Sequence, residues 1–269
     1  MQTYELLMCT PIDRDPRTAI AAAKAAVTRD PNAHPNIQAM AAIPDNSPLQ
    51  PQHIAVVNAK YWGMGGLKLS VGFLDNPTTE LRSRILSHMN AWGKTANVEF
   101  AETADAQGAE VRINRAPTND PQWAGYWSFV GTDIKLYTGP YNQTMNLEGF
   151  TMNTPDSEFY RVVRHETGHT LGFPHEHMRK NLVAKIDRNK AIQYYGRLCG
   201  WSPQQVIDQV LTPISDADIT GTEEDPLSIM CYQVPGQVTI DGQPIIGGLD
   251  IDQVDYDFAA LIYPKPVES

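Results

Sequence analysis

The order of the apolar patterns along this 269-residue chain predicts a fold of the α+β class. An alternating strand pattern comes first, and a helix pattern with one apolar face follows it. Several short strand patterns then lead to a second helix, which carries a cluster of histidines, and an apolar helix closes the chain. Elements in this order are expected to form a mixed sheet with helices packed on it.

The first 60 residues are rich in Ala, Pro, Asn and Asp and are expected to form a separate part of the chain. Asp15-Pro16 predicts the start of a short Ala-rich helix that runs to about Thr28. Repeated prolines between Pro31 and Pro51 keep the chain after it extended or irregular. We interpret residues 1–60 as an N-terminal extension or a pro-segment, and residues 61–269 as the main domain. An extension is favoured, because the sequence contains no readable cleavage signal.

The predicted sheet begins at Leu67–Leu74, where apolar and polar residues alternate. A helix follows from Pro77 onward, and its apolar residues recur at helical spacing, which indicates a face that packs on the core. These residues are Leu81, Ile85, Met89 and Trp92. Further short strands are predicted at Val98–Ala101, Ala109–Asn114, Tyr126–Gly131 and Ile134–Tyr137.

Three helices are expected in the second half of the chain. The first begins near Thr154-Pro155 and contains the histidine cluster. After His177 the pattern becomes irregular, until Ser202-Pro203 predicts the start of another helix. The last helix covers Ile251–Ile262 and ends before a proline.

The composition is that of an ordinary globular protein, with 42% hydrophobic residues and a net charge of −10. This acidic balance argues against nucleic acid or an anionic membrane as the main partner. Three cysteines can form at most one disulfide bond, so we expect free thiols. No apolar run is long enough to span a bilayer. The first residues lack the features of a secretory signal. We expect a secreted or exported protein, but a signal could be absent from this sequence, the protein could leave by another route, or it could stay inside.

The stretch His165–His177 contains four of the seven histidines of the chain. His165 and His169 are four residues apart, so both rings lie on one face of a helix. Gly172 favours the left-handed turn that ends helices, after which His175 can return to the same point. Three protein ligands with one open position are typical of a catalytic zinc ion, and Glu166 lies close enough to handle a water molecule there.

A second group of residues, Asp225–Tyr232, lies about 55 residues further along the chain. Pro226 favours a turn, and Met230 is a flexible apolar side chain suited to the floor of a metal site. Tyr232 could bring a hydroxyl group to the metal or to a developing oxyanion.

The motifs HETGHTLGFPHEH and SIMCY together resemble the astacin-type zinc peptidases of the metzincin clan, which read HExxHxxGFxHE and SxMHY. Trp127–Gly131 is similar to the WSYVG strand of that family, and Leu249–Tyr263 to its final helix. Residues 187–211 resemble the bacterial branch. The resemblance covers roughly residues 62–264 and leaves the first 60 unaccounted for.

The resemblance implies a metzincin-like catalytic domain over residues 61–269. Its upper lobe has a mixed twisted sheet and two long helices, and its irregular lower lobe contains the Met-turn and the C-terminal helix. It implies one Zn²⁺ ion held by His165, His169 and His175, and a protein or peptide as substrate. An extended peptide is expected to bind along the predicted strand Ile134–Tyr137. Neither the resemblance nor the composition indicates an oligomeric state.

The resemblance also assigns a role to each of four further residues. Glu166 is the general base, Met230 belongs to the Met-turn, and Tyr232 is a switchable fifth ligand. Glu176 occupies the place of the glutamate that anchors the freed mature N-terminus in that family. Three departures stand out: Cys231 replaces a histidine, three cysteines cannot form two disulfides, and no N-terminal processing point is evident.

Three alternatives remain open at the level of sequence. The N-terminal segment could block the cleft of a latent or inactive zinc protein, with Cys9, Asp13 or Asp15 as the blocking ligand. The cleft could also serve peptide binding alone, although a binding module has no need of a base such as Glu166. Finally, His177 could replace His175 as the third ligand, although the spacing favours His175.

Overall fold

The computed structural model describes residues 55–57, 60–63, 66–118, 123–136, 143–214, 219–221 and 224–266 of the chain. The Ala-rich helix predicted at Asp15–Thr28 and the residues Cys9, Asp13 and Asp15 lie outside the described residues. In the part that is described, no helix is both long and apolar enough to cross a membrane.

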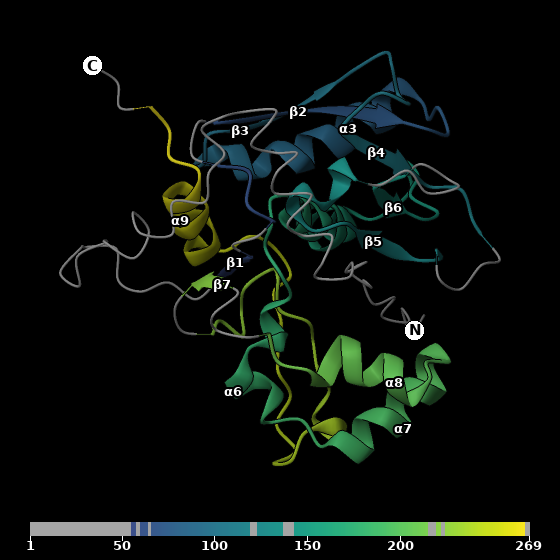
Figure 1. Cartoon of the computed structure of the whole chain (residues 1–269). Coiled ribbons are helices and arrows are strands. Elements are labelled where there is room, and N and C mark those ends of the chain that lie inside the picture. The colour runs from purple at the N-terminus through teal and green to yellow at the C-terminus, as the bar shows by residue number, and fades with distance from the viewer. Residues whose placement is uncertain are drawn as a thin grey trace.

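A five-stranded mixed sheet forms the upper part of the molecule (Figure 1). Its strands lie in the order β3-β2-β4-β6-β5, and all neighbours are parallel except β5, which runs antiparallel to β6 at one edge. The strands are β2 (Leu67–Phe73), β3 (Val98–Glu102), β4 (Val111–Asn114), β5 (Tyr126–Ser128) and β6 (Met145–Leu147). The expected mixed sheet of an α+β protein is therefore confirmed.

Two long helical stretches pack side by side against this sheet (Figure 1). The first is α3 (Thr79–Met89), which Thr78 caps by accepting a hydrogen bond from the backbone N–H of Leu81. Its predicted apolar face is buried. The second stretch runs through α4 (Asp156–Glu158), a π-helix at Phe159–Val163 and α5 (Arg164–Thr170).

The lower part of the molecule has a small apolar core of its own, formed around Leu182, Tyr195, Val206 and Val234. It contains α6 (Lys180–Val183), α7 (Arg188–Cys199), α8 (Pro203–Val206) with a following π-helix at Ile207–Leu211, and a 3-10 helix at Gly236–Val238. Strand β1 (Ala55–Val57) pairs with β7 (Ile219–Gly221), and α9 (Gln253–Ile262) packs against the upper core. The histidine helix therefore ends near the junction of two cores.

The prediction of a strand at Ile134–Tyr137 is wrong. Gly131–Lys135 forms a 3-10 helix, and Tyr137 lies outside the described residues. Gly131 has a φ of +52°, which turns the chain out of an extended path. Asp133 points inward and pairs with Lys60 at 2.9 Å, so polar and apolar residues are buried together here. This segment cannot be the strand along which a substrate was expected to bind.

Helix α7 also corrects the sequence interpretation, which expected an irregular chain after His177. Only Ala191 and Tyr195 are buried in this helix, so its apolar periodicity is weak. Its ends are nevertheless well marked: Asp187 accepts two backbone hydrogen bonds at the start, and Gly200 has a φ of +69° at the end.

Residues 60–62 make side-chain contacts with the rest of the described structure. Besides the pair of Lys60 with Asp133, the hydroxyl group of Tyr61 donates a hydrogen bond to the carbonyl of Ile262 at 2.7 Å. The indole N–H of Trp62 donates to the carbonyl of Thr170 at 2.8 Å. These contacts tie residues 60–62 to the 3-10 helix at Gly131–Lys135, to the last helix and to the histidine helix.

Candidate metal centre

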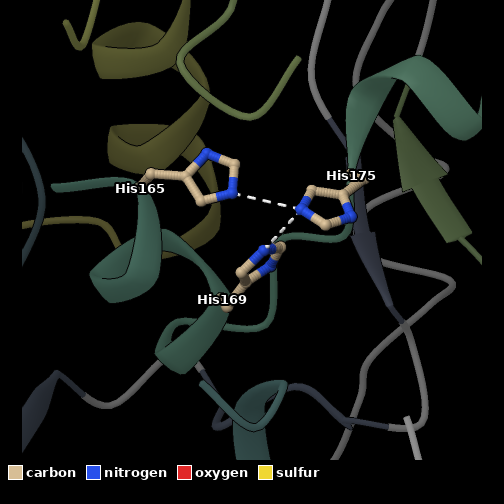
Figure 2. Close-up of side chains that lie close together, drawn as sticks. All are labelled: His165, His169 and His175. Carbon is tan, nitrogen blue, oxygen red and sulfur yellow. Dashed lines mark hydrogen bonds between the residues drawn. The ribbon is translucent and has the colours of Figure 1, made fainter. Parts of the chain in front are cut away.

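Three histidine side chains converge on one point at the end of α5 (Figure 2). His165 and His169 lie one turn apart on this helix, and Gly172, with a φ of +99°, turns the chain so that His175 faces them. The Nε2 atom of His175 lies 3.1 Å from Nε2 of His165 and 3.0 Å from Nε2 of His169. The structure thus brings together the three residues that the spacing predicted.

For two of the three rings, a neighbouring carbonyl group determines which ring nitrogen carries a proton. Nδ1 of His165 lies 2.7 Å from the carbonyl oxygen of Ile229, and Nδ1 of His169 lies 2.7 Å from that of Phe173. A carbonyl oxygen can only accept, so both Nδ1 atoms must donate. Both Nε2 atoms therefore present lone pairs to the same point.

These lone pairs fit a cation. His175 could donate a proton from Nε2 to only one of the two neighbouring nitrogens. Nε2 of His175 and the other nitrogen would then face each other with no hydrogen between them and would repel. A metal ion at the shared point satisfies all three. Zinc bound at roughly 2.0–2.1 Å from each nitrogen in tetrahedral geometry places ligand atoms roughly 3.4 Å apart, close to the observed spacing.

Burial keeps the three rings neutral. It lowers the pKa of His165 to about 4, and it lowers the pKa values of His169 and His175 well below the ordinary 6.5. The desolvation of a charged ring is the main cause, and the neighbouring histidines add to it for His169 and His175. Neutral imidazole is the form that binds metal ions.

His177 does not belong to this group. Its ring lies 5.1 Å from the ring of His175, between centroids, and Nε2 is 3.2 Å from the carbonyl oxygen of Gln209. Among the described residues, the group of side chains that could hold a metal ion consists of His165, His169 and His175.

Glu166 is fully buried directly after the first histidine. Its side chain lines a small pocket together with His165 and Tyr232. Its backbone carbonyl accepts a hydrogen bond from Ser128 Oγ at 2.8 Å, which joins this turn of the helix to the edge strand β5. Glu166 thus lies at the wall of a pocket that His165 also lines.

Met230 packs against the histidine helix at Gly168 and is completely buried. A side chain on Gly168 would overlap its Sδ atom and would come within 3.2 Å of its Cε atom and of Trp92. The glycine inside this helix is therefore explained by close packing on Met230. The preceding residue, Ile229, supplies the carbonyl group that orients His165.

The ring of Tyr232 packs on two of the three histidines. Its centroid lies 4.1 Å from that of His175, and 5.7 Å from that of His165 with nearly parallel planes. Tyr232 is half-buried and lines the same pocket as Glu166. The ring of Tyr232 is thereby placed beside the cluster.

Glu176 is buried on the other side of His175. Its backbone N–H donates to the carbonyl of Met230 at 2.9 Å, and its carboxylate accepts from the backbone N–H of Asp225 at 3.3 Å. Nη1 of Arg179 lies 3.5 Å from the same carboxylate. Burial raises the pKa of Glu176 to about 8, although Arg179 opposes the shift.

Comparison with known proteins identifies this arrangement. The family model for the astacin peptidases matches residues 58–233. The chain belongs to the astacin family. It is a zinc metalloendopeptidase, and its substrates are therefore proteins or peptides. No curated protein sequence matches it.

Several solved structures of other proteins are similar to this chain. One structure of myroilysin is similar with a TM-score of 0.70 and 28% identity, covering 79% of this chain and 100% of that chain. A crystal structure of myroilysin has a TM-score of 0.57 and 23% identity, covering 96% and 100%. High choriolytic enzyme 1, a hatching enzyme zinc-protease from the medaka fish Oryzias latipes, has a TM-score of 0.47 and 16% identity, covering 73% and 88%.

One further residue of this astacin-type centre was missed at the level of sequence. Asp255, on α9, is buried and accepts hydrogen bonds from Ser228 Oγ at 2.7 Å and from the backbone N–H of Ile229 at 2.9 Å. It also caps its own helix together with Asp252. An acidic residue three positions after a helix cap was the available signal, but it indicated only a capping box.

Proposed function

We propose that this astacin-family peptidase cleaves internal peptide bonds with a water molecule that Glu166 deprotonates, at a zinc ion held by His165, His169 and His175. The convergence of three Nε2 atoms beside the buried carboxylate of Glu166 supports this proposal. When bound, zinc polarises the carbonyl of the scissile bond and makes the attacking water more acidic.

The remaining steps fall to side chains of the protein. Glu166 accepts the proton of the attacking water and delivers it to the amine that leaves. The hydroxyl group of Tyr232 donates a hydrogen bond to the oxyanion that develops on the carbonyl. Met230 packs on Gly168 of the histidine helix. The backbone N–H of Glu176, next to His175, binds the turn at residues 228–231, which we call the Met230 turn.

Replacement of Glu166 by glutamine tests the central step. The amide cannot accept the proton, yet it leaves the three histidines intact. We expect E166Q to bind one zinc ion per chain by elemental analysis and to lose nearly all cleavage of a mixed peptide library. Cleavage at the wild-type rate by zinc-loaded E166Q would exclude Glu166 as the base.

We further propose that residues 1–60 are separable from the peptidase domain over residues 61–269. The support for this boundary is the burial of Tyr61 and Trp62, the first two residues of that domain. A chain that lacks residues 1–50 keeps these contacts, so we expect it to fold and to bind zinc. If its activity greatly exceeds that of the full chain, the removed segment covers the cleft; equal activity would identify a structural extension.

A further inference from the structure

A groove with a volume of about 320 Å³ opens next to the metal centre, on the lower part of the molecule. One wall comes from α7, with Tyr194 and Leu198, and the other comes from the chain after the Met230 turn, with Pro235, Pro244 and Ile246. We call this the α7 groove. The family match ends at residue 233, so the second wall lies beyond the part shared with the family model.

The α7 groove shares part of its lining with the pocket at the histidines. Arg161, Tyr232 and Gln233 line both spaces, and the histidine pocket also includes His165 and Glu166. A polypeptide whose scissile bond lies beside Glu166 therefore has neighbouring side chains within reach of this groove.

The walls of the groove are mainly apolar and partly open to solvent. Ile246 is 62% exposed and Leu198 is 43% exposed, so two large aliphatic side chains stand at the rim. Covering such surfaces with an apolar group is favourable, because it removes apolar area from water. Sites for small molecules typically measure roughly 300–1,000 Å³. The groove lies at the lower end of this range, so it has room for a single large side chain.

Among the described residues that line the groove, Arg161 is the one cation, and it is already paired. It binds Glu158 in a two-pronged arrangement, with Nε 3.1 Å from one carboxylate oxygen and Nη2 2.7 Å from the other. Its charge is thereby compensated inside the protein. The described walls thus offer no uncompensated positive charge that would select an acidic side chain.

The walls are also fixed in place. Val234 and Ile245 exchange two backbone hydrogen bonds of 2.9 Å, which hold the chain of the second wall. Tyr195 is buried beneath the first wall and packs against Tyr194, with 5.1 Å between ring centroids. A preformed groove can bind a side chain without first being ordered.

We propose that the α7 groove receives a large apolar side chain of the substrate, aromatic or branched aliphatic, at one fixed position near the cleaved bond. This inference rests on the proposed function, because it places the reacting bond beside Glu166. The enzyme is therefore expected to prefer substrates with an apolar rather than an acidic residue at that position.

The test compares cleavage of a mixed peptide library by the zinc-loaded full chain and three variants, with sites identified by mass spectrometry. The wild type should enrich large apolar residues at one position relative to the cut. Ile246→Asp should reduce the ratio of kcat/KM between peptides with Leu and Ala at that position by at least about tenfold. Ile240→Asp is the matched control, since Ile240 is 65% exposed and does not line the groove, and it should leave the ratio unchanged.

Glu158→Gln provides a second, opposite perturbation. It uncovers the charge of Arg161 and should raise cleavage of peptides with an acidic residue at the same position. If the wild type cleaves peptides without any enriched position, or if Ile246→Asp and Ile240→Asp behave alike, the groove proposal is overturned while the proposed function stands. Absence of any cleavage both by the zinc-loaded full chain and by the zinc-loaded chain that lacks residues 1–50 would overturn the proposed function and the groove proposal with it.

Discussion

Replacement of Gly168 by alanine tests how tightly the Met230 turn supports the metal centre. In an ordinary helix this change stabilises a protein by about 1 kcal/mol. Here the new methyl group would overlap Sδ of Met230 and approach Trp92 to 3.2 Å, and both side chains are completely buried. Overpacking of this kind costs about 1–3 kcal/mol.

We expect the upper part of that range, because the side chains of Met230 and Trp92 are both completely buried. Subtracting the gain in helix propensity leaves a net destabilisation of about 2 kcal/mol. For a chain of this size that corresponds to a fall in the melting temperature of about 4–8 °C. Displacement of the Met230 turn also shifts the Ile229 carbonyl that orients His165, and loss of such support typically weakens metal binding about 10–100-fold.

Gly196 provides the matched control, because it also lies inside a helix. A methyl group there meets only the carbonyl of Trp201 at 3.4 Å, which is an ordinary contact. Gly196→Ala should therefore stabilise the protein by up to about 1 kcal/mol. Thermal unfolding with and without a chelator, together with a zinc competition titration, measures both effects. If Gly168→Ala is as stable as Gly196→Ala and binds zinc as the wild type does, the packing argument is refuted.

Further predictions address the ligands, the tyrosine and Asp255. His175→Ala should lose stoichiometric zinc and His177→Ala should keep it, as elemental analysis will show; the reverse result would exchange their roles. Tyr232→Phe should lower kcat by about a hundredfold with little change in KM, and an unchanged kcat in steady-state kinetics would remove the hydroxyl group from the reaction. Burial raises the pKa of Asp255 from 3.8 to about 7, so between these pH values its carboxyl group is protonated in the folded protein and ionised in the unfolded chain. The free energy of unfolding therefore falls by up to about 1.4 kcal/mol per pH unit as the pH rises through this range. Asp255→Asn should remove that slope in denaturant unfolding between pH 4 and pH 7, and identical pH profiles of variant and wild type would contradict it.

Sequence reasoning succeeded where the chemistry is local. The positions of His165, His169, Gly172 and His175 depend on one helix and one turn, and helical spacing alone determines which side of a helix a residue faces. The core face of α3 was predictable for the same reason. In each case the residues that interact are close together in the chain.

It failed where distant residues decide the local structure. The alternation around Ile134 resembles a strand, but Asp133 is drawn inward by Lys60, which lies more than 70 positions earlier. Strand β6 covers only three residues, and its pairing with β4 and β5 is determined by the sheet rather than by its own pattern. Short segments of this kind have little periodicity to read.

The support of the metal centre belongs to the same class of long-range effects. The turn around Ile229 is held from α9 through Asp255, it orients His165 through its carbonyl, and it meets the loop of Glu176 through the carbonyl of Met230. Each of these contacts joins segments that are at least 25 residues apart, as the 26 residues between Ile229 and Asp255 illustrate. The histidine motif therefore predicts which residues can bind the metal, whereas the orientation of the His165 ring depends on the contact that Asp255 of α9 makes with the turn around Ile229. It follows that a substitution on α9, far from the histidines in sequence, can weaken zinc binding without touching a ligand.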